Sequence, residues 1–176
     1  MRAAEPDALL LVTDRPRSLN SGEASGITLA LPQDLAERVR ESRLALAAFA
    51  VVLHRYTGQS ELPLDADLSG GGDGGLTLTV DPDEPIAALL AKADRAVADR
   101  PAAGTAVRFA DHRTEARTVP GDLPDPAAEI ALTVDGGTLH LGYRSSLFER
   151  ETVERFGAHL LRAMRFLAGH PHRPVR

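Results

Sequence analysis

Two short runs in the last third of the chain alternate between large apolar residues and small or polar ones, which is typical of β-strands with one buried face. The runs cover 130–134 and 139–143, and Gly136 and Gly137 lie between them. A tight turn at these glycines places the large apolar residues of both runs on the same face. The pattern therefore predicts an antiparallel hairpin packed on a core, with Val134 opposite Leu139, Leu132 opposite Leu141 and Ile130 opposite Tyr143.

The strongest helical signal is a segment in which every residue is apolar, from Leu44 to Leu53. A helix that is apolar all round must be covered on several sides, so we expect this one at the centre of the core. His54 and Arg55 follow it and Gly58 comes just beyond, which indicates a helix C-terminus. Similar patterns predict further helices over 33–43, 86–100 and 149–168, and strands over 27–31, 61–68, 76–80 and 105–110.

Helices and strands are mixed along the chain without regular alternation. This order predicts an α+β fold in which helices pack against a mixed, mostly antiparallel sheet. The length of 176 residues suits a single domain over 1–176. Within it we expect three irregular segments: a loop-like N-terminal arm (1–26), a flexible glycine-rich loop (69–75) and a proline-rich connection (111–128).

The glycine-rich segment invites two functional interpretations, a phosphate-binding loop and a calcium-binding loop. It lacks the Lys-Ser/Thr ending of a P-loop and the spacing of the dinucleotide-binding motif. For calcium, Leu76 stands where a bidentate Glu should complete the ligand shell of an EF-hand-like loop. We therefore favour a flexible loop, which marks either a long turn or the trace of a deletion. The residues that do fit the calcium pattern are Asp65, Asp67, Ser69, Gly70 and Asp73.

The composition argues against several classes of function. With 20 Lys+Arg against 25 Asp+Glu the formal net charge is −5, whereas nucleic-acid-binding proteins normally carry a basic excess. The chain has no Cys, which excludes a disulfide scaffold, thiolate metal sites and a cysteine nucleophile. Its apolar runs are too short for a signal peptide or a bilayer span. We expect a cytoplasmic protein that binds neither nucleic acid nor membrane.

The spacing of polar residues does not assemble a catalytic or metal site. No His-Glu-x-x-His motif is present, and Ser145 and Ser146 do not lie in a nucleophile elbow. We therefore expect no catalytic residue, no metal and no cofactor. The last predicted helix carries a basic stripe with an apolar residue on the same face. We interpret it either as a solvated face or as a contact site for an acidic partner. The stripe consists of Arg155, His159, Arg162 and Phe166.

Four segments occur in the same order in one known family. Leu11–Arg17 reads Leu-Val-Thr-Asp-Arg-Pro-Arg, and Leu46–Gln59 ends in His-Arg-Tyr-Thr-Gly-Gln. Leu76–Val97 has the pattern of a strand followed by a helix, and Leu139–Pro171 contains Tyr-x-x-x-Leu-Phe before its final helix. They resemble segments of nonribosomal peptide synthetase condensation domains, and the match covers most of 9–171. The resemblance implies a single chloramphenicol-acetyltransferase-like lobe, namely the C-terminal one of the two that form such a domain.

The sequence departs from the family in the parts that carry its chemistry. The family's condensation step relies on a His-His-x-x-x-Asp-Gly motif in the first lobe, and this sequence contains no His-His pair. A channel motif of the family contains Trp, and this chain has no Trp. The segments that resemble the family form the core, whereas those that line the tunnel between the lobes are short or missing. No catalytic or binding residue of the family can therefore be assigned here.

The resemblance leads to three hypotheses. The first is a truncated, non-catalytic domain that acts as a docking or stabilising module beside an adenylation domain or a carrier protein of a peptide synthetase. The second is half of a split acyltransferase, completed by a separate lobe that carries the histidine motif. The third is a homodimerising module that recruits carriers or tailoring enzymes. In the first hypothesis the basic stripe is the expected partner contact.

Overall fold

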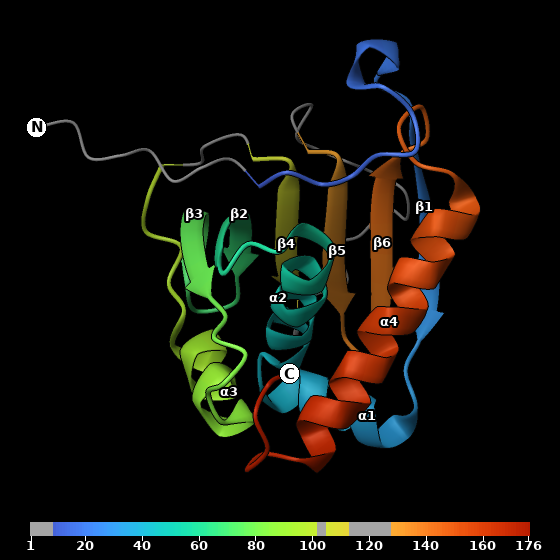
Figure 1. The fold of residues 1–176 in the computed structure, drawn as a ribbon. Coiled ribbons are helices and arrows are strands. Elements are labelled where there is room, and N and C mark those ends of the chain that lie inside the picture. The colour runs from blue at the N-terminus through green and yellow to red at the C-terminus, as the bar shows by residue number, and fades with distance from the viewer. Residues whose placement is uncertain (1–8, 102–104, 113–127) are drawn as a thin grey trace, which may run out of the picture.

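The computed structural model describes residues 9–101, 105–112 and 128–176, and its elements form one mixed sheet with helices against it (Figure 1). The helices are η1 (Arg17–Leu19, a 3₁₀ turn), α1 (Gln33–Glu41), α2 (Leu44–Thr57), α3 (Ile86–Arg95) and α4 (Arg150–Gly169). The strands are β1 (Ala24–Ala30), β2 (Glu61–Leu68), β3 (Gly72–Thr79), β4 (Val107–His112), β5 (Ile130–Asp135) and β6 (Thr138–Arg144).

The six strands lie in the order β1-β6-β5-β4-β2-β3. The pairs β1–β6, β5–β6 and β2–β3 are antiparallel, whereas β2–β4 and β4–β5 are parallel. Figure 1 shows α2 and α4 on one face of this sheet, with α1 at their lower end. The expected α+β fold with a mixed sheet is therefore confirmed. In the described ranges, no helix combines the length and the apolar character that crossing a bilayer requires.

Helix α2 occupies the centre of the core, as its sequence predicts. Every residue from Leu44 to Leu53 is buried. Phe49 is fully buried and packs against Phe109 of β4 and Phe156 of α4, with ring centroids 6.2 and 6.0 Å apart. The core is thus built around an aromatic cluster that joins the sheet to two helices.

The predicted hairpin is confirmed in its register. Strands β5 and β6 pair Val134 with Leu139 and continue to Ile130 opposite Tyr143. Strand β1 then adds to the free side of β6. It begins at Ala24 and not at Ile27, because its ladder with β6 continues that far. The boundary expected for the N-terminal arm is corrected accordingly.

The described part of the arm is fixed to the beginning of helix α4. The Asp14 carboxylate accepts the Glu149 N–H at 2.7 Å and the Thr152 hydroxyl at 3.0 Å, so it caps the first turn of α4. Arg17 donates to Glu129 at 2.6 Å, and this hydrogen bond raises the pKa of Arg17 above its ordinary value. The Thr-Asp-Arg-Pro-Arg motif is therefore a structural clamp.

The glycine-rich segment is not a flexible loop over most of its length, and that expectation is wrong. Residues 69–71 form a turn, and β3 begins at Gly72. A Cβ on Gly74 would collide with the Arg100 carbonyl oxygen, and one on Gly72 would lie 2.9 Å from the carbonyl oxygen of Ala98. These positions are glycine because segment 96–101 crosses them closely.

The residues of the calcium pattern lie in a hairpin and not in an EF-hand-like loop. Asp65 and Asp67 belong to β2, and Asp73 of β3 stands opposite Asp67. Within the described residues, no group of three His, Asp or Glu side chains could hold a metal ion. Of the expected proline-rich connection, Asp111 and His112 belong to β4, which corrects its start. Its part over 113–127 lies outside the described residues.

Helix α3 ends at Arg95 and not near Arg100 as its periodicity predicts. The cause is Arg43, which is buried just before α2 and reaches the end of α3. Its guanidinium takes the backbone carbonyls that a further helical turn would use. These are the carbonyls of Ala93 at 3.3 Å, Asp94 at 3.2 Å and Ala96 at 2.6 Å. The chain therefore leaves the helix and runs toward β3.

Candidate docking groove between helices α2 and α4

A groove lies between α2 and α4, the two helices that pack side by side in Figure 1. It consists of two adjoining hollows of about 430 and 280 Å³, and Arg55 and Arg162 line both. We call it the α2–α4 groove. Its lining residues are Val51, Val52, Arg55, Tyr56, His159, Arg162, Ala163, Phe166, Leu167 and Arg176.

The groove forms where the apolar contact between the two helices reaches the surface. Phe156 of α4 packs against Tyr56 of α2 with ring centroids 5.2 Å apart, and the same phenyl ring contacts Phe49 in the core. Tyr56 therefore rests on buried aromatic residues, although its own side chain is partly exposed. This support holds the wall of the groove in one position.

A polar contact joins the two helices above this aromatic support. The Tyr56 hydroxyl and His159 Nδ1 lie 2.9 Å apart. The pKa of Tyr56 is raised above its ordinary value, because burial disfavours the phenolate, while the positive charge of Arg155 acts in the opposite direction. The groove thus contains a neutral phenol held against an imidazole.

The charge of the groove comes from arginines. Arg55 and Arg162 are exposed and form no ion pair with any described residue. Arg176 pairs with Asp83 at 2.8 Å, but these side chains are 70% and 71% exposed, so water screens the pair. None of the lining residues carries a carboxylate side chain. The groove therefore has the character of an anion-binding surface.

The structure brings together most of the basic stripe predicted on the last helix. His159, Arg162 and Phe166 line the groove, whereas Arg155 lies beside it and donates to the Thr152 hydroxyl at 3.2 Å. Phe166 is half-buried and does not protrude as expected for an apolar anchor. Its ring stacks on that of His170, with centroids 5.0 Å apart.

Periodicity along α4 does not reveal the other side of the groove. Arg55 and Tyr56 follow the apolar segment of α2, and in the sequence they indicate only a helix end. Arg176 comes close because the chain after α4 pairs with the start of α3, where the Val175 N–H donates to the Glu84 carbonyl at 3.1 Å. These neighbours depend on tertiary packing, which no local pattern predicts.

No protein-family model matches the sequence, and no curated protein is significantly similar to it. Solved structures do match. The X-domain in its complex with OxyB from teicoplanin biosynthesis aligns with a TM-score of 0.71 and 16% identity over 98% of this chain and 52% of that chain. The condensation domain of Monacolin K polyketide synthase MokA aligns with a TM-score of 0.66 and 18% identity over 93% of this chain and 51% of that one.

The cyclization-docking bidomain of EpoB from Sorangium cellulosum aligns with a TM-score of 0.70 and 13% identity, over 96% of this chain and 46% of that chain. The fold is that of a condensation-domain lobe. The chain spans about half the length of these structures, as a condensation lobe should when a complete domain has two. The sequence resemblance to condensation domains is thereby confirmed at the level of the fold, and assignment to the C-terminal lobe stays a prediction.

Proposed function

We propose that this condensation lobe is a non-catalytic docking module of a nonribosomal peptide synthetase assembly line, and that the α2–α4 groove receives an acidic surface of a neighbouring domain. The observation that carries the proposal is the pair Arg55 and Arg162, which line one groove from two helices without an ion pair to any described residue. A partner carboxylate supplies the counter-charge that the groove lacks.

The groove also has the features of a binding surface that needs little rearrangement. Its walls are two rigid helices, and Tyr56 is fixed by the Phe156 ring and by His159. Val51 and Leu167 are buried and line the same groove as the arginines. An apolar floor with a charged rim is the arrangement that concentrates binding energy at protein interfaces.

Two partners fit the proposal. In condensation-domain proteins this lobe is expected to pack against the adenylation domain that follows, so an adenylation domain is the first candidate and a carrier protein the second. Two of the matching structures support a multi-domain context. One is the four-domain nonribosomal peptide synthetase AB3403, of which this chain covers 19%, and the other is the X-domain in complex with OxyB.

The test is a calorimetric titration of the purified chain with an adenylation domain and, separately, with a carrier protein. We expect one partner to bind, with an affinity that falls as ionic strength rises. The double substitution Arg55→Glu and Arg162→Glu weakens binding about tenfold or more. Arg40→Glu on α1 and Arg95→Glu at the end of α3 together make the same charge change outside the groove and leave the affinity unchanged. Failure of both partners to bind, or an equal loss in this control variant, contradicts the proposal.

The non-catalytic role has a test of its own. The sequence contains no His-His pair, so we expect the chain to form no dipeptide when it is mixed with two loaded carrier proteins. Product detected by mass spectrometry above a no-protein control would refute this part of the proposal.

The half-length match favours one alternative, in which a second chain completes a split acyltransferase. The alternative predicts that a separate lobe with the histidine motif binds this chain and that the mixture forms product. A lobe that neither binds nor restores product formation excludes it.

A further inference from the structure

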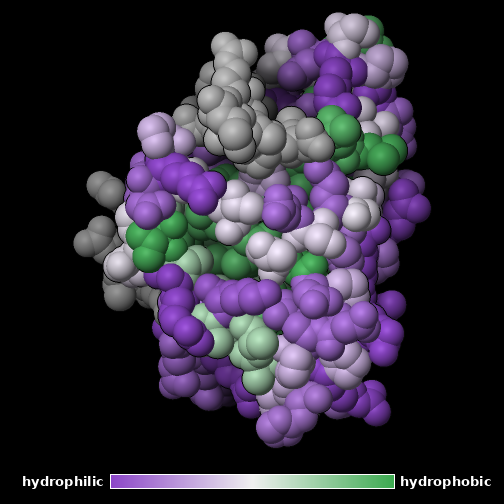
Figure 2. All heavy atoms as spheres, turned by 60° about the vertical axis from the view of Figure 1, so that its left-hand side comes forward, coloured by the Kyte–Doolittle hydropathy of each residue, from purple (hydrophilic) through white to green (hydrophobic). Residues whose placement is uncertain are grey.

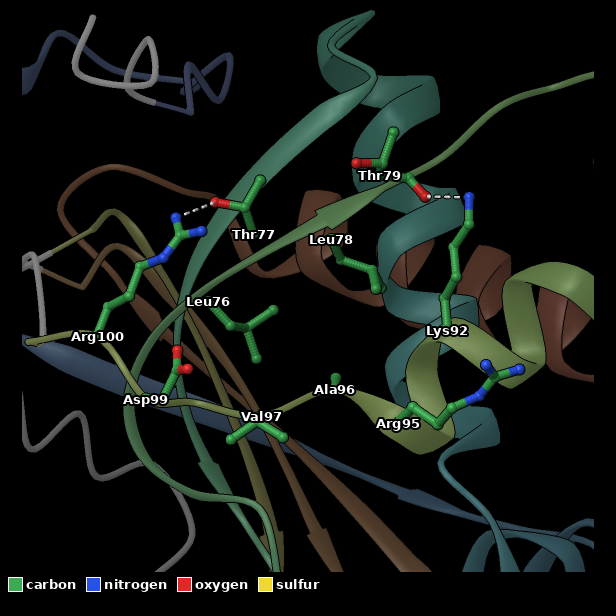
Figure 3. Close-up of a pocket in the computed structure, with 10 residues that line it drawn as sticks. All are labelled: Leu76, Thr77, Leu78, Thr79, Lys92, Arg95, Ala96, Val97, Asp99 and Arg100. Atoms are coloured by element: carbon green, nitrogen blue, oxygen red, sulfur yellow. Dashed lines mark hydrogen bonds between the residues drawn. The ribbon is translucent and has the colours of Figure 1, made fainter. Parts of the chain in front are cut away.

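A second groove, separate from the α2–α4 groove, follows the outer edge of β3. It has a volume of about 630 Å³ and lies between residues 76–79 of β3, the end of α3 and the segment 96–100 (Figure 3). Strand β3 is the last strand of the sheet, so it has a neighbouring strand on one side only. On the side of the molecule that carries β3 and α3, Figure 2 shows apolar surface between bands of hydrophilic side chains.

The backbone of β3 leaves hydrogen-bonding groups free along this groove. Gly75 exchanges two backbone hydrogen bonds with Arg100, at 2.9 and 3.4 Å, so the N–H and C=O of Gly75 point away from β2. In an antiparallel strand every second residue points the same way, so those of Thr77 and Thr79 also point outward. Among the described residues, the backbone of Thr77 meets no neighbouring strand on that side.

The residue opposite Thr77 in β2 also indicates that the N–H and C=O of Thr77 point outward. Thr77 stands across from Pro63 of β2, and Pro63 has no N–H to donate. The hydrogen-bonded pairs between the two strands must therefore be the alternate ones, such as Leu76 with Leu64. Pairing with Arg100 thus stops at Gly75, and no strand within the described residues pairs with the outer side of Leu76–Thr79.

The edge is held in an accessible position by Arg43. Its guanidinium binds the Ala96 carbonyl at 2.6 Å and the Ser69 carbonyl at 3.1 Å, which ties the end of α3 to the β2–β3 turn. Segment 96–101 therefore crosses β3 at Gly72 and Gly74 and does not run along the rest of the strand. Val97, which lines the groove, is 55% exposed. Another strand placed here can make an apolar contact with Val97 and backbone hydrogen bonds with β3.

The charged residues of the groove favour an acidic occupant. Lys92, Arg95 and Arg100 line it, against one acidic residue, Asp99. Figure 3 shows Lys92 and Arg100 reaching β3, where Lys92 donates to the Thr79 carbonyl and Arg100 to the Thr77 hydroxyl, each at 3.4 Å. Lys92 is paired with Glu84 at 2.7 Å, whereas Arg95 has no ion pair with a described residue.

We propose that the open edge of β3 accepts an extended segment of a partner polypeptide as an additional strand, and that this segment alternates acidic and apolar residues. Successive side chains of an added strand point to opposite faces of the sheet. On one face they meet the basic side chain of Arg100 beside Thr77, and on the other they meet apolar Leu76 and Val97. A second copy of this chain does not fit, because pairing two β3 edges brings like charges together.

The test uses a fluorescent synthetic peptide of about eight residues in which Val and Glu alternate, titrated into the full chain and followed by anisotropy. We expect saturable binding, with at least about tenfold weaker binding of the counterpart that carries Lys in place of Glu. Arg100→Glu should reverse this preference, so that the Lys peptide binds better. Arg162→Glu, which reverses a charge in the α2–α4 groove, should leave both affinities unchanged.

A backbone readout separates strand addition from plain charge attraction. Thr77→Pro removes the outward N–H at an edge position that tolerates proline, and should weaken the Glu peptide about tenfold. In the unsubstituted protein the bound peptide should slow amide hydrogen exchange at Thr77 and Thr79 but not at Thr28 on the other edge strand. No binding, equal binding of both peptides, or binding without protection of β3 overturns the proposal. So does a dimer in light scattering that Thr77→Pro dissolves, because the occupant is then a second copy.

Discussion

The α2–α4 groove and the β3 edge are both basic hollows, but they present different chemistry to a partner. In the groove the recognition groups are side chains, chiefly Arg55 and Arg162 on two helices. At the edge they are the backbone N–H and C=O groups of β3, with Arg100 and Arg95 around them. Helices satisfy their own backbone and leave only side chains for binding, whereas an edge strand keeps half of its backbone available. If both proposals hold, the lobe has one surface that binds through side chains and one that binds mainly through the backbone.

The two sites also differ in what supports them. The groove rests on an apolar stack in which Phe156 joins Tyr56 to Phe49. The edge depends on one buried polar side chain, Arg43, which lies 3.9 Å from the Asp111 carboxylate and binds carbonyls of α3 and of the β2–β3 turn. Apolar packing tolerates small adjustments, but a buried charge that loses its partner does not.

The largest expected effect therefore comes from Arg43→Met, which keeps the volume but removes the guanidinium 3.9 Å from the buried Asp111 carboxylate and leaves α3 with uncapped carbonyls. We expect the free energy of unfolding to fall by about 3 to 5 kcal/mol, measured by urea denaturation. Arg40→Met, an exposed arginine on α1, should change it by no more than about 0.5 kcal/mol. Equal effects of the two substitutions would show that Arg43 does not support the edge.

A smaller effect distinguishes two glycines with positive φ. Gly74 has φ 152° and no room for a Cβ beside the Arg100 carbonyl, whereas Gly58 has φ 72° at the end of α2 and open space around it. We expect Gly74→Ala to lower the free energy of unfolding by about 2 to 4 kcal/mol and Gly58→Ala by about 1 kcal/mol. The same denaturation experiment compares them, and a smaller loss at Gly74 would contradict the close approach of segment 96–101.

The smallest effect concerns Tyr56, which lines the α2–α4 groove and has no tyrosine counterpart among the residues that line the β3 edge. Its raised pKa means that the folded chain holds the phenolic proton more tightly than the unfolded chain. The resulting stabilisation is complete below pH of about 10 and is lost as pH rises through the folded pKa. An ultraviolet titration of the Tyr143→Phe variant should show phenolate formation above the ordinary pKa. Adding Arg155→Ala should raise that pKa further, and a lowered value in either variant refutes the assignment.

The sequence predicts best where one local pattern decides the structure. The register of β5 and β6 follows from alternation around Gly136 and Gly137, and the burial of α2 follows from its unbroken apolar run. Prediction fails where distant residues decide. Arg43 ends α3 through hydrogen bonds to residues such as Ala96, and nothing near Arg43 in the sequence indicates this.

The same limit applies to the two basic hollows. The stripe on α4 is visible from helical spacing, so His159 and Arg162 are predicted together. Arg176 joins them only through the path of the chain after α4. The glycines of the β2–β3 hairpin resemble a flexible loop in sequence, because glycine serves both flexibility and close packing. Only the position of segment 96–101 distinguishes these roles.

The clamp at Asp14 has a consequence for the α2–α4 groove. Helix α4 is a single rod of 20 residues, about 30 Å long, and its first turn is tied to the arm while its later turns carry His159 and Arg162. One continuous helix therefore carries both the contact with the arm and the side chains of the groove, so a substitution that removes the Asp14 carboxylate acts on the same element that positions His159 and Arg162.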